Sequence, residues 1–140
     1  MKFPMKKGKV VLIFSCCFND SLTFTNSQLE NFLTEIADWD GYSVLQGGMI
    51  YTDGHLKVPE DGTYYVYAQL FFHSYGRVEV FKNDEEPLTM LHYPDVPGGS
   101  KYAGGAFRLK AGDTISLRAI VDVKLYMAAF HSYFGAFLIQ

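Results

Sequence analysis

The side chains that could carry out chemistry are few and widely separated in this chain of 140 residues. Metal-binding sites usually draw histidines and carboxylates from short spacings, but the four histidines stand far apart, at His55, His73, His92 and His131. The two cysteines, Cys16 and Cys17, are adjacent, and adjacent cysteines rarely satisfy disulfide geometry. The absence of a Cys-x-x-Cys pair argues against structural zinc.

Other catalytic patterns are equally weak. No serine lies in a Gly-x-Ser-x-Gly elbow, and His131 beside Ser132 is more typical of a loop than of a catalytic dyad. The acidic run Asp84-Glu85-Glu86 could bind calcium in principle, but such runs are usually solvated. The Gly-Gly pairs lack the lysine and following helix of a phosphate-binding loop. We therefore predict no catalytic residue, cofactor, metal or substrate, and interpret the protein as a binding protein rather than an enzyme.

Composition limits the class of partner. Hydrophobic residues make up 49% and charged residues 19%, which excludes a disordered chain, and the length suits one domain spanning residues 1–140. The net charge of −3 argues against a nucleic-acid partner. Aromatic residues reach 16%, which raises the question of where so much aromatic surface is buried.

The first 18 residues allow more than one interpretation. Lys2, Lys6, Lys7 and Lys9 precede the apolar stretch 10–18, as in a secretory signal peptide, although the cleavage site is poor. The same stretch fits a first buried strand equally well, and a truncated membrane anchor would leave a similar remnant.

Elements expected to position a site are short strands separated by turns. Apolar spacing at 27–36 allows a short helix or an anchored loop, and no later segment indicates a helix. We expect strands, weakest at 125–130, over residues 43–51, 55–58, 63–72, 78–82, 88–93, 102–109, 114–121, 125–130 and 133–139. Asp53-Gly54 and Gly112-Asp113 mark tight turns. This pattern predicts an all-β protein built as a two-sheet antiparallel sandwich.

The strand at 63–72 is apolar on both faces. Alternation predicts a core set facing inward, namely Tyr64, Val66, Leu70, Phe72, Ile115, Leu117, Phe134 and Leu138. Tyr65, Tyr67, Gln69 and Phe71 then face outward, whereas Thr114, Ser116 and Arg118 give their strand an ordinary polar face. A single sandwich has nothing to place against a second aromatic face, so we expect partner subunits to cover it.

Three motifs together resemble the tumour necrosis factor ligand family, from Trp39 to Gln140. They are the Leu-x-Val and Gly-x-Tyr-x-x-Tyr-x-Gln-like stretch at 53–69, the glycine-containing strand and Gly-Asp turn at 102–113, and the closing strand at 133–139, which begins Tyr-Phe-Gly-Ala. Residues 78–82, residues 89–91 and Tyr102 are similar to the branch containing ectodysplasin and B-cell activating factor. That branch usually carries a disulfide whose positions correspond here to Tyr93 and Lys101, so the bridge is absent. The head domain of complement-type proteins shares the fold and is the alternative.

The resemblance implies a jelly roll that assembles as a homotrimer, outside the cell, either secreted or shed from a membrane-anchored precursor. It would act as a cytokine in immune signalling by clustering cysteine-rich receptor ectodomains of the tumour necrosis factor receptor family. A complement-like recognition module, a capsid-like jelly roll and a carbohydrate-binding sandwich are the other classes considered. The residues expected at the trimer interface are Tyr65, Tyr67, Gln69, Tyr102, Gly104, Phe107, Tyr133, Gly135 and Phe137.

Receptor contacts are expected, from the same resemblance, in the loop between Asn83 and Ser100. Its candidates are Leu88, Tyr93, Pro94 and Val96. Tyr93 is the preferred anchor, because tyrosine is favoured at interface hot spots. The alternative is that Tyr93 packs back on its own sandwich.

Overall fold

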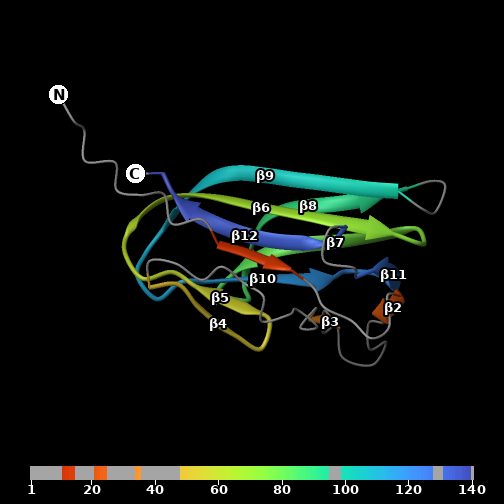
Figure 1. The fold of residues 1–140 in the computed structure, drawn as a ribbon, viewed down its shortest axis with the longest axis horizontal. Helices are drawn as coiled ribbons and strands as arrows, with labels where there is room; N and C mark the ends of the chain where they lie inside the picture. Colours follow the sequence, from red (N-terminus) through yellow and green to blue (C-terminus); the bar gives the residue numbers. More distant parts are fainter. Residues whose placement is uncertain are drawn as a thin grey trace.

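The computed structural model of the protein describes residues 48–94, 99–127 and 131–139, together with the backbone of 11–14, 21–24 and 34–35. Every regular element in these residues is a β-strand, arranged in two antiparallel sheets (Figure 1). Within the same residues no helix is long and apolar enough to cross a membrane. The predicted all-β, two-sheet antiparallel fold is confirmed.

The first sheet is organised around its longest strands. Its strands are β1 (Val11–Phe14), β2 (Ser21–Phe24), β6 (Gly62–Phe72), β9 (Gly99–Leu109), β11 (Val123–Tyr126) and β12 (Tyr133–Leu138). One edge of β6 pairs with β12 and then with β11, while β9 pairs along the whole of the other edge. β1 and β2 lie outside β12 and β11, respectively.

The second sheet has the order β4-β5-β10-β7-β8, and β3 also pairs with β10. Its strands are β3 (Thr34–Glu35), β4 (Ile50–Thr52), β5 (His55–Lys57), β7 (Gly76–Lys82), β8 (Glu86–Tyr93) and β10 (Thr114–Ala119). The β4–β5 turn has positive φ angles at Asp53 (45°) and Gly54 (83°), the geometry for which an Asp-Gly pair is favoured in two-residue hairpins. The predicted turn at Gly112 also has a positive φ, of 91°.

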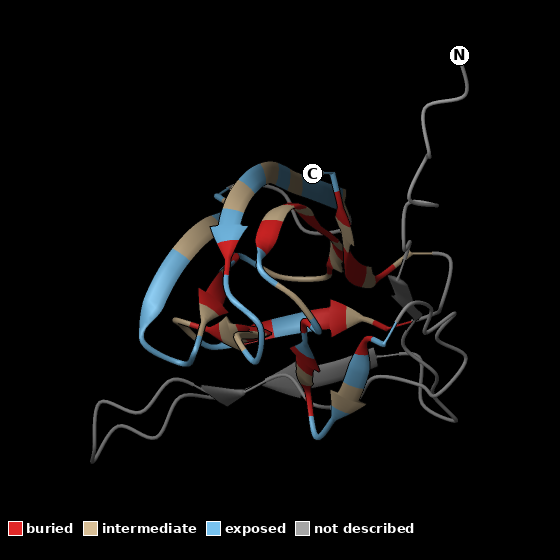
Figure 2. Cartoon of the chain, turned by 90° about the vertical axis from the view of Figure 1, so that its left-hand side faces the viewer, coloured by how far each residue is buried: buried red, intermediate tan, exposed pale blue. Residues whose placement is uncertain are grey.

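The core lies between the two sheets, where buried segments of the layers face each other (Figure 2). All eight side chains predicted to face inward are buried. Among the described residues, Tyr64, Phe72 and Phe134 are the largest side chains that are fully buried. Alternating strand faces therefore predicted the core correctly.

Several boundaries differ from expectation. Residues Val11–Phe14 form a strand paired with β12, and the rest of 1–18 lies outside the described residues. Thr34 and Glu35 are a strand rather than part of a helix, and 27–33 and 36 are not described. The strand expected at 43–51 begins at Ile50, and 43–47 lie outside the described part.

Candidate functional site

The outer surface of the first sheet carries a continuous group of aromatic side chains, which we call the aromatic face. The strand register builds it, because Tyr67 of β6 lies between Gly135 of β12 and Gly104 of β9. The members of the aromatic face are Tyr65, Tyr67, Gln69, Phe71, Tyr102, Gly104, Tyr133, Gly135 and Phe137. Eight of the nine residues predicted for the interface therefore share one surface.

Ring contacts connect its centre. The Tyr65 ring centroid lies 5.4 Å from that of Phe137 and 6.1 Å from that of Tyr67, and Tyr67 lies 6.4 Å from Tyr133. These neighbours leave only 7% of Tyr67 exposed. Burial is the main reason that the pKa of the Tyr67 hydroxyl is raised.

A hydrogen bond closes the aromatic face over β9. The hydroxyls of Tyr65 and Tyr102 lie 2.8 Å apart above Gly104, where a Cβ would overlap both oxygens. Desolvation, and then the hydrogen bond with Tyr65, raise the pKa of Tyr102 to about 12. Tyr102 nevertheless stays 53% exposed, so the aromatic face has a large apolar ring that its own chain leaves open.

Gln69 makes two further polar contacts on the aromatic face. The Tyr133 hydroxyl donates to Gln69 Oε1 at 3.2 Å, and Gln69 Nε2 donates to the backbone oxygen of His131 at 3.3 Å. The amide therefore ties β6 to the start of β12.

Beyond Gln69 the aromatic face continues into a second ring cluster that sequence reasoning missed. The Phe71 ring centroid lies 5.2 Å from that of His131, 5.8 Å from that of Tyr126 and 5.5 Å from that of His73. Alternation placed Phe71 on this surface, but only the pairing of β11 with β6 brings Tyr126 beside it.

Phe107 does not belong to the aromatic face. Its register partner is Tyr64, whose side chain points into the core, and Phe107 packs against that core. Ala106 is opposite Tyr65 and so lies on the side of β9 that carries the aromatic face. Phe107 is the next residue and points to the opposite side, because side chains alternate along a strand. Phe107 therefore lies on the other side of β9 from Tyr102 and Gly104, and its place at the trimer interface stays a prediction.

The expected receptor anchor packs against its own sandwich. The Tyr93 ring is stacked on Phe72, with centroids 5.8 Å apart and planes at 9°, and the Lys101 ammonium lies 5.5 Å from the Tyr93 centroid. Tyr93 and Lys101 are the two positions at which the family resemblance would place a disulfide, and here they form a cation–π contact instead. Leu88 also packs against the core, so both Leu88 and Tyr93 pack back on their own sandwich, as the alternative for Tyr93 predicted.

The segment between Asn83 and Ser100 is not one loop, since β8 occupies most of it. Pro94 is exposed, and Val96 lies outside the described residues. Sequence reasoning missed a nearby group of exposed side chains on the outer surface of β7 and β8. Tyr75 is 56% and Met90 47% exposed, and the Tyr75 ring lies 5.8 Å from that of His92. We call Tyr75, Met90, His92 and Pro94 the lateral patch.

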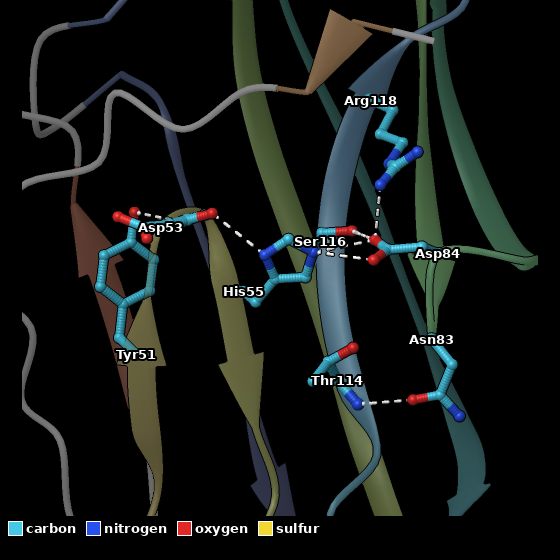
Figure 3. A network of polar contacts seen from close by, with 9 residues as sticks. Tyr51, Asp53, His55, Asn83, Asp84, Thr114, Ser116 and Arg118 are labelled. Carbon is cyan, nitrogen blue, oxygen red and sulfur yellow. Dashed lines mark hydrogen bonds and ion pairs between the residues drawn. The ribbon is translucent and has the colours of Figure 1, made fainter. Parts of the chain in front are cut away.

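The outer surface of the second sheet holds a polar network (Figure 3). Asp84 Oδ1 accepts from His55 Nε2 at 2.9 Å, from Arg118 Nη2 at 2.7 Å and from Ser116 Oγ at 3.2 Å. Partial burial by itself would raise the pKa of Asp84, but the His55 hydrogen bond and the Arg118 charge outweigh it and lower the pKa. Ser116, expected on a wet face, is 1% exposed beside this network.

Among the described residues no group of three histidine, cysteine, aspartate or glutamate side chains could hold a metal ion. Two carboxylates of the run at 84–86 are already paired, Asp84 with His55 and Arg118, and Glu86 with Lys82 at 2.9 Å. The arrangement of this run is that of a charged turn.

Comparison with known proteins adds a family. Residues 37–97 match the model of the TNF (Tumour Necrosis Factor) family. The match supports a domain of the tumour necrosis factor ligand family in this part of the chain. This match covers β4 to β8 and therefore includes the hairpin and the two-faced strand that carried the resemblance.

Solved structures of ligands in this family have the same fold. Murine APRIL at pH 5.0 is 22% identical with a TM-score of 0.70, over 95% of this chain and 100% of that chain. Eiger TNF from S. frugiperda is 17% identical with a TM-score of 0.73, over 95% and 93% of the two chains. Rabbit GITRL is 20% identical with a TM-score of 0.58, over 94% of each chain. The jelly-roll fold is thereby confirmed.

Proposed function

We propose that the protein is a tumour necrosis factor-like ligand that acts as a homotrimer, outside the cell, and clusters cysteine-rich receptor ectodomains. The observation that carries this proposal is the aromatic face on a domain of this family. The centre of the aromatic face is buried, with Tyr67 only 7% exposed, whereas Tyr102 at its margin is 53% exposed. An aromatic surface of this kind is a protein-interaction site rather than an ordinary solvated sheet.

A second copy is the occupant that suits the aromatic face best. Three chains around an axis would remove the Tyr102 rings from water, and Gly135, which adds no side chain to the aromatic face, would let backbones approach closely. In a closed threefold ring the contacts are heterologous, so two different parts of the aromatic face would meet the two neighbouring chains.

Receptor contact is proposed at the lateral patch. Tyr75 and Met90 are the exposed large apolar side chains on the β7–β8 side of the described residues, and tyrosine is enriched among binding hot spots. Arg77 pairs with Glu79 on the same surface at 2.6 Å, which supplies a polar rim. Tyr93 and Leu88 instead support this surface from the core side.

Assembly is tested by sedimentation of the wild type and two matched variants. Tyr102→Arg places a charge on the aromatic face, and Tyr75→Arg places the same charge on a side chain of similar exposure in the lateral patch. The wild type and Tyr75→Arg should sediment with three times the mass of one 15.8 kDa chain, whereas Tyr102→Arg should sediment with the mass of a single chain. A wild type that stays monomeric at micromolar concentration contradicts the trimer.

Receptor recognition is tested by pull-down, in which the immobilised protein is offered soluble receptor ectodomains and microbial surface ligands. The trimer should retain cysteine-rich ectodomains of the tumour necrosis factor receptor family, and Tyr75→Ala should weaken binding by about 2 kcal/mol or more at a hot spot. Undiminished binding by Tyr75→Ala removes the lateral patch from the proposal, and retention of microbial surface ligands in place of receptors replaces the proposed class of partner.

A further inference from the structure

His55 is held between two hydrogen-bond acceptors. Its Nδ1 lies 3.0 Å from the backbone oxygen of Asp53, and its Nε2 lies 2.9 and 3.1 Å from the two carboxylate oxygens of Asp84 (Figure 3). A neutral imidazole has one N–H and one lone pair, so it can donate to only one of these partners. In the neutral state the second nitrogen would direct its lone pair at another acceptor.

Double protonation removes this conflict. An imidazolium donates from both nitrogens, and its bond to a carboxylate is charge-assisted. We propose that His55 is a proton-operated clasp, which in its doubly protonated state fastens the β7–β8 turn across β10 to β5.

The clasp joins three elements of the second sheet. His55 belongs to β5, Asp84 to the turn at 83–85, and Arg118 and Ser116 to the intervening strand β10. Asp84 has a positive φ of 59°, so the turn holds a backbone conformation that non-glycine residues seldom adopt. Side-chain bonds to Asp84 are therefore well placed to keep the turn in this shape.

The charges around His55 favour a bound proton. The carboxylate of Asp84 faces it directly, and Arg118 lies on the far side of that carboxylate, 2.7 Å from Oδ1. Lys57 shares the outer surface of β5, Lys82 is paired with Glu86, and Arg77 is paired with Glu79. Asp113 is bonded to Asn83 and to the backbone of Lys110. The charged group that is hydrogen-bonded to the His55 ring is therefore the anion Asp84.

Because the folded state favours protonated His55, the stability of the turn should depend on pH. A histidine that holds its proton more tightly when folded contributes stability that is complete below its ordinary titration range, near pH 6.5, and is lost as the pH rises through its folded midpoint. The turn keeps other attachments at high pH, because Arg118 and Ser116 still bond to Asp84 and the Thr114 amide donates to Asn83 Oδ1 at 2.9 Å. Raising the pH should therefore loosen the turn without unfolding the sheet.

The test is ¹⁵N NMR titration of the histidine side chains in the intact protein. Wild-type His55 should show two protonated nitrogens at pH 6.5 and a midpoint above about 6.5, the ordinary value. His92, whose ring contact is with Tyr75, provides an internal comparison. A neutral His55 tautomer at pH 6, or a midpoint at or below about 6.5, overturns the proposal.

Two carboxylate variants separate the clasp from general charge. Asp84→Asn should lower the His55 midpoint, whereas Glu85→Gln makes the same charge change in the same turn and should leave it in place. Amide exchange in the turn should quicken above the midpoint in the wild type and be fast and pH-independent, after correction for intrinsic exchange, in His55→Gln. Equal midpoints in both carboxylate variants contradict the clasp.

Discussion

Phe134 and Phe137 show how one strand divides its side chains between two tasks. Phe134 is fully buried in the core, whereas Phe137 contacts Tyr65 on the aromatic face. We expect Phe134→Ala to lower the free energy of unfolding by about 3–5 kcal/mol, because it removes a large ring and leaves a cavity. Denaturant unfolding measures this change, and a loss below about 1 kcal/mol would contradict the core position.

Tyr93 is the residue whose expected role changes most. Its stacking on Phe72 and its contact with Lys101 predict that Tyr93→Ala destabilises the domain, by about 1–3 kcal/mol. Tyr75→Ala removes a ring that is 56% exposed and should change stability by no more than about 0.5 kcal/mol. Melting temperatures of the two variants provide the comparison, and an unchanged value for Tyr93→Ala would restore it as a candidate receptor anchor.

At the scale of elements, the turn before β10 depends on an ionised carboxylate. The side-chain amide of Asn83 and the backbone N–H of Lys110 donate to Asp113, and these bonds lower the pKa of Asp113. A lowered folded pKa contributes stability that is present above the ordinary value of about 3.9 and is lost as the pH falls through the folded pKa.

The prediction is a smaller loss of stability in acid for Asp113→Asn than for the wild type. Urea unfolding between about pH 5 and pH 3 measures it, a window that covers the ordinary carboxylate pKa. Glu85→Gln removes an exposed carboxylate of the neighbouring turn and should preserve the wild-type profile. Parallel profiles for the wild type and Asp113→Asn would rule out this role for Asp113.

At the scale of the whole molecule, Gly135 should limit how closely subunits approach. Gly135 lies opposite Tyr67 in the middle of the aromatic face, between Tyr133 and Phe137. Gly135→Val adds a branched side chain there, so we expect the proposed trimer to dissociate at higher protein concentrations than the wild type. Sedimentation over a dilution series measures this, with circular dichroism to verify the β-structure. Identical dissociation curves would mean that Gly135 is not at the subunit contact.

The sequence by itself determined the parts of this protein that depend on alternation and local turns. Side chains alternate along an extended strand whatever its neighbours are, so the buried set on β6, β10 and β12 was predicted correctly. Asp53-Gly54 and Gly112 act locally through their backbone angles, which is why those turns were found. The aromatic outer surface of β6 was visible for the same reason.

Tertiary structure decided everything that depends on which strands meet. Register placed Phe107 opposite Tyr64 and therefore on the core side of β9, although the family resemblance grouped it with Tyr102 and Gly104. Packing between sheets put Tyr93 on Phe72, a partner 21 positions away in the sequence. The network around Asp84 joins residues from β5, a turn and β10, and no spacing in the chain encodes that encounter. Contacts between distant segments arise only when the sheets pair and pack, because the local pattern specifies a face and not its neighbour.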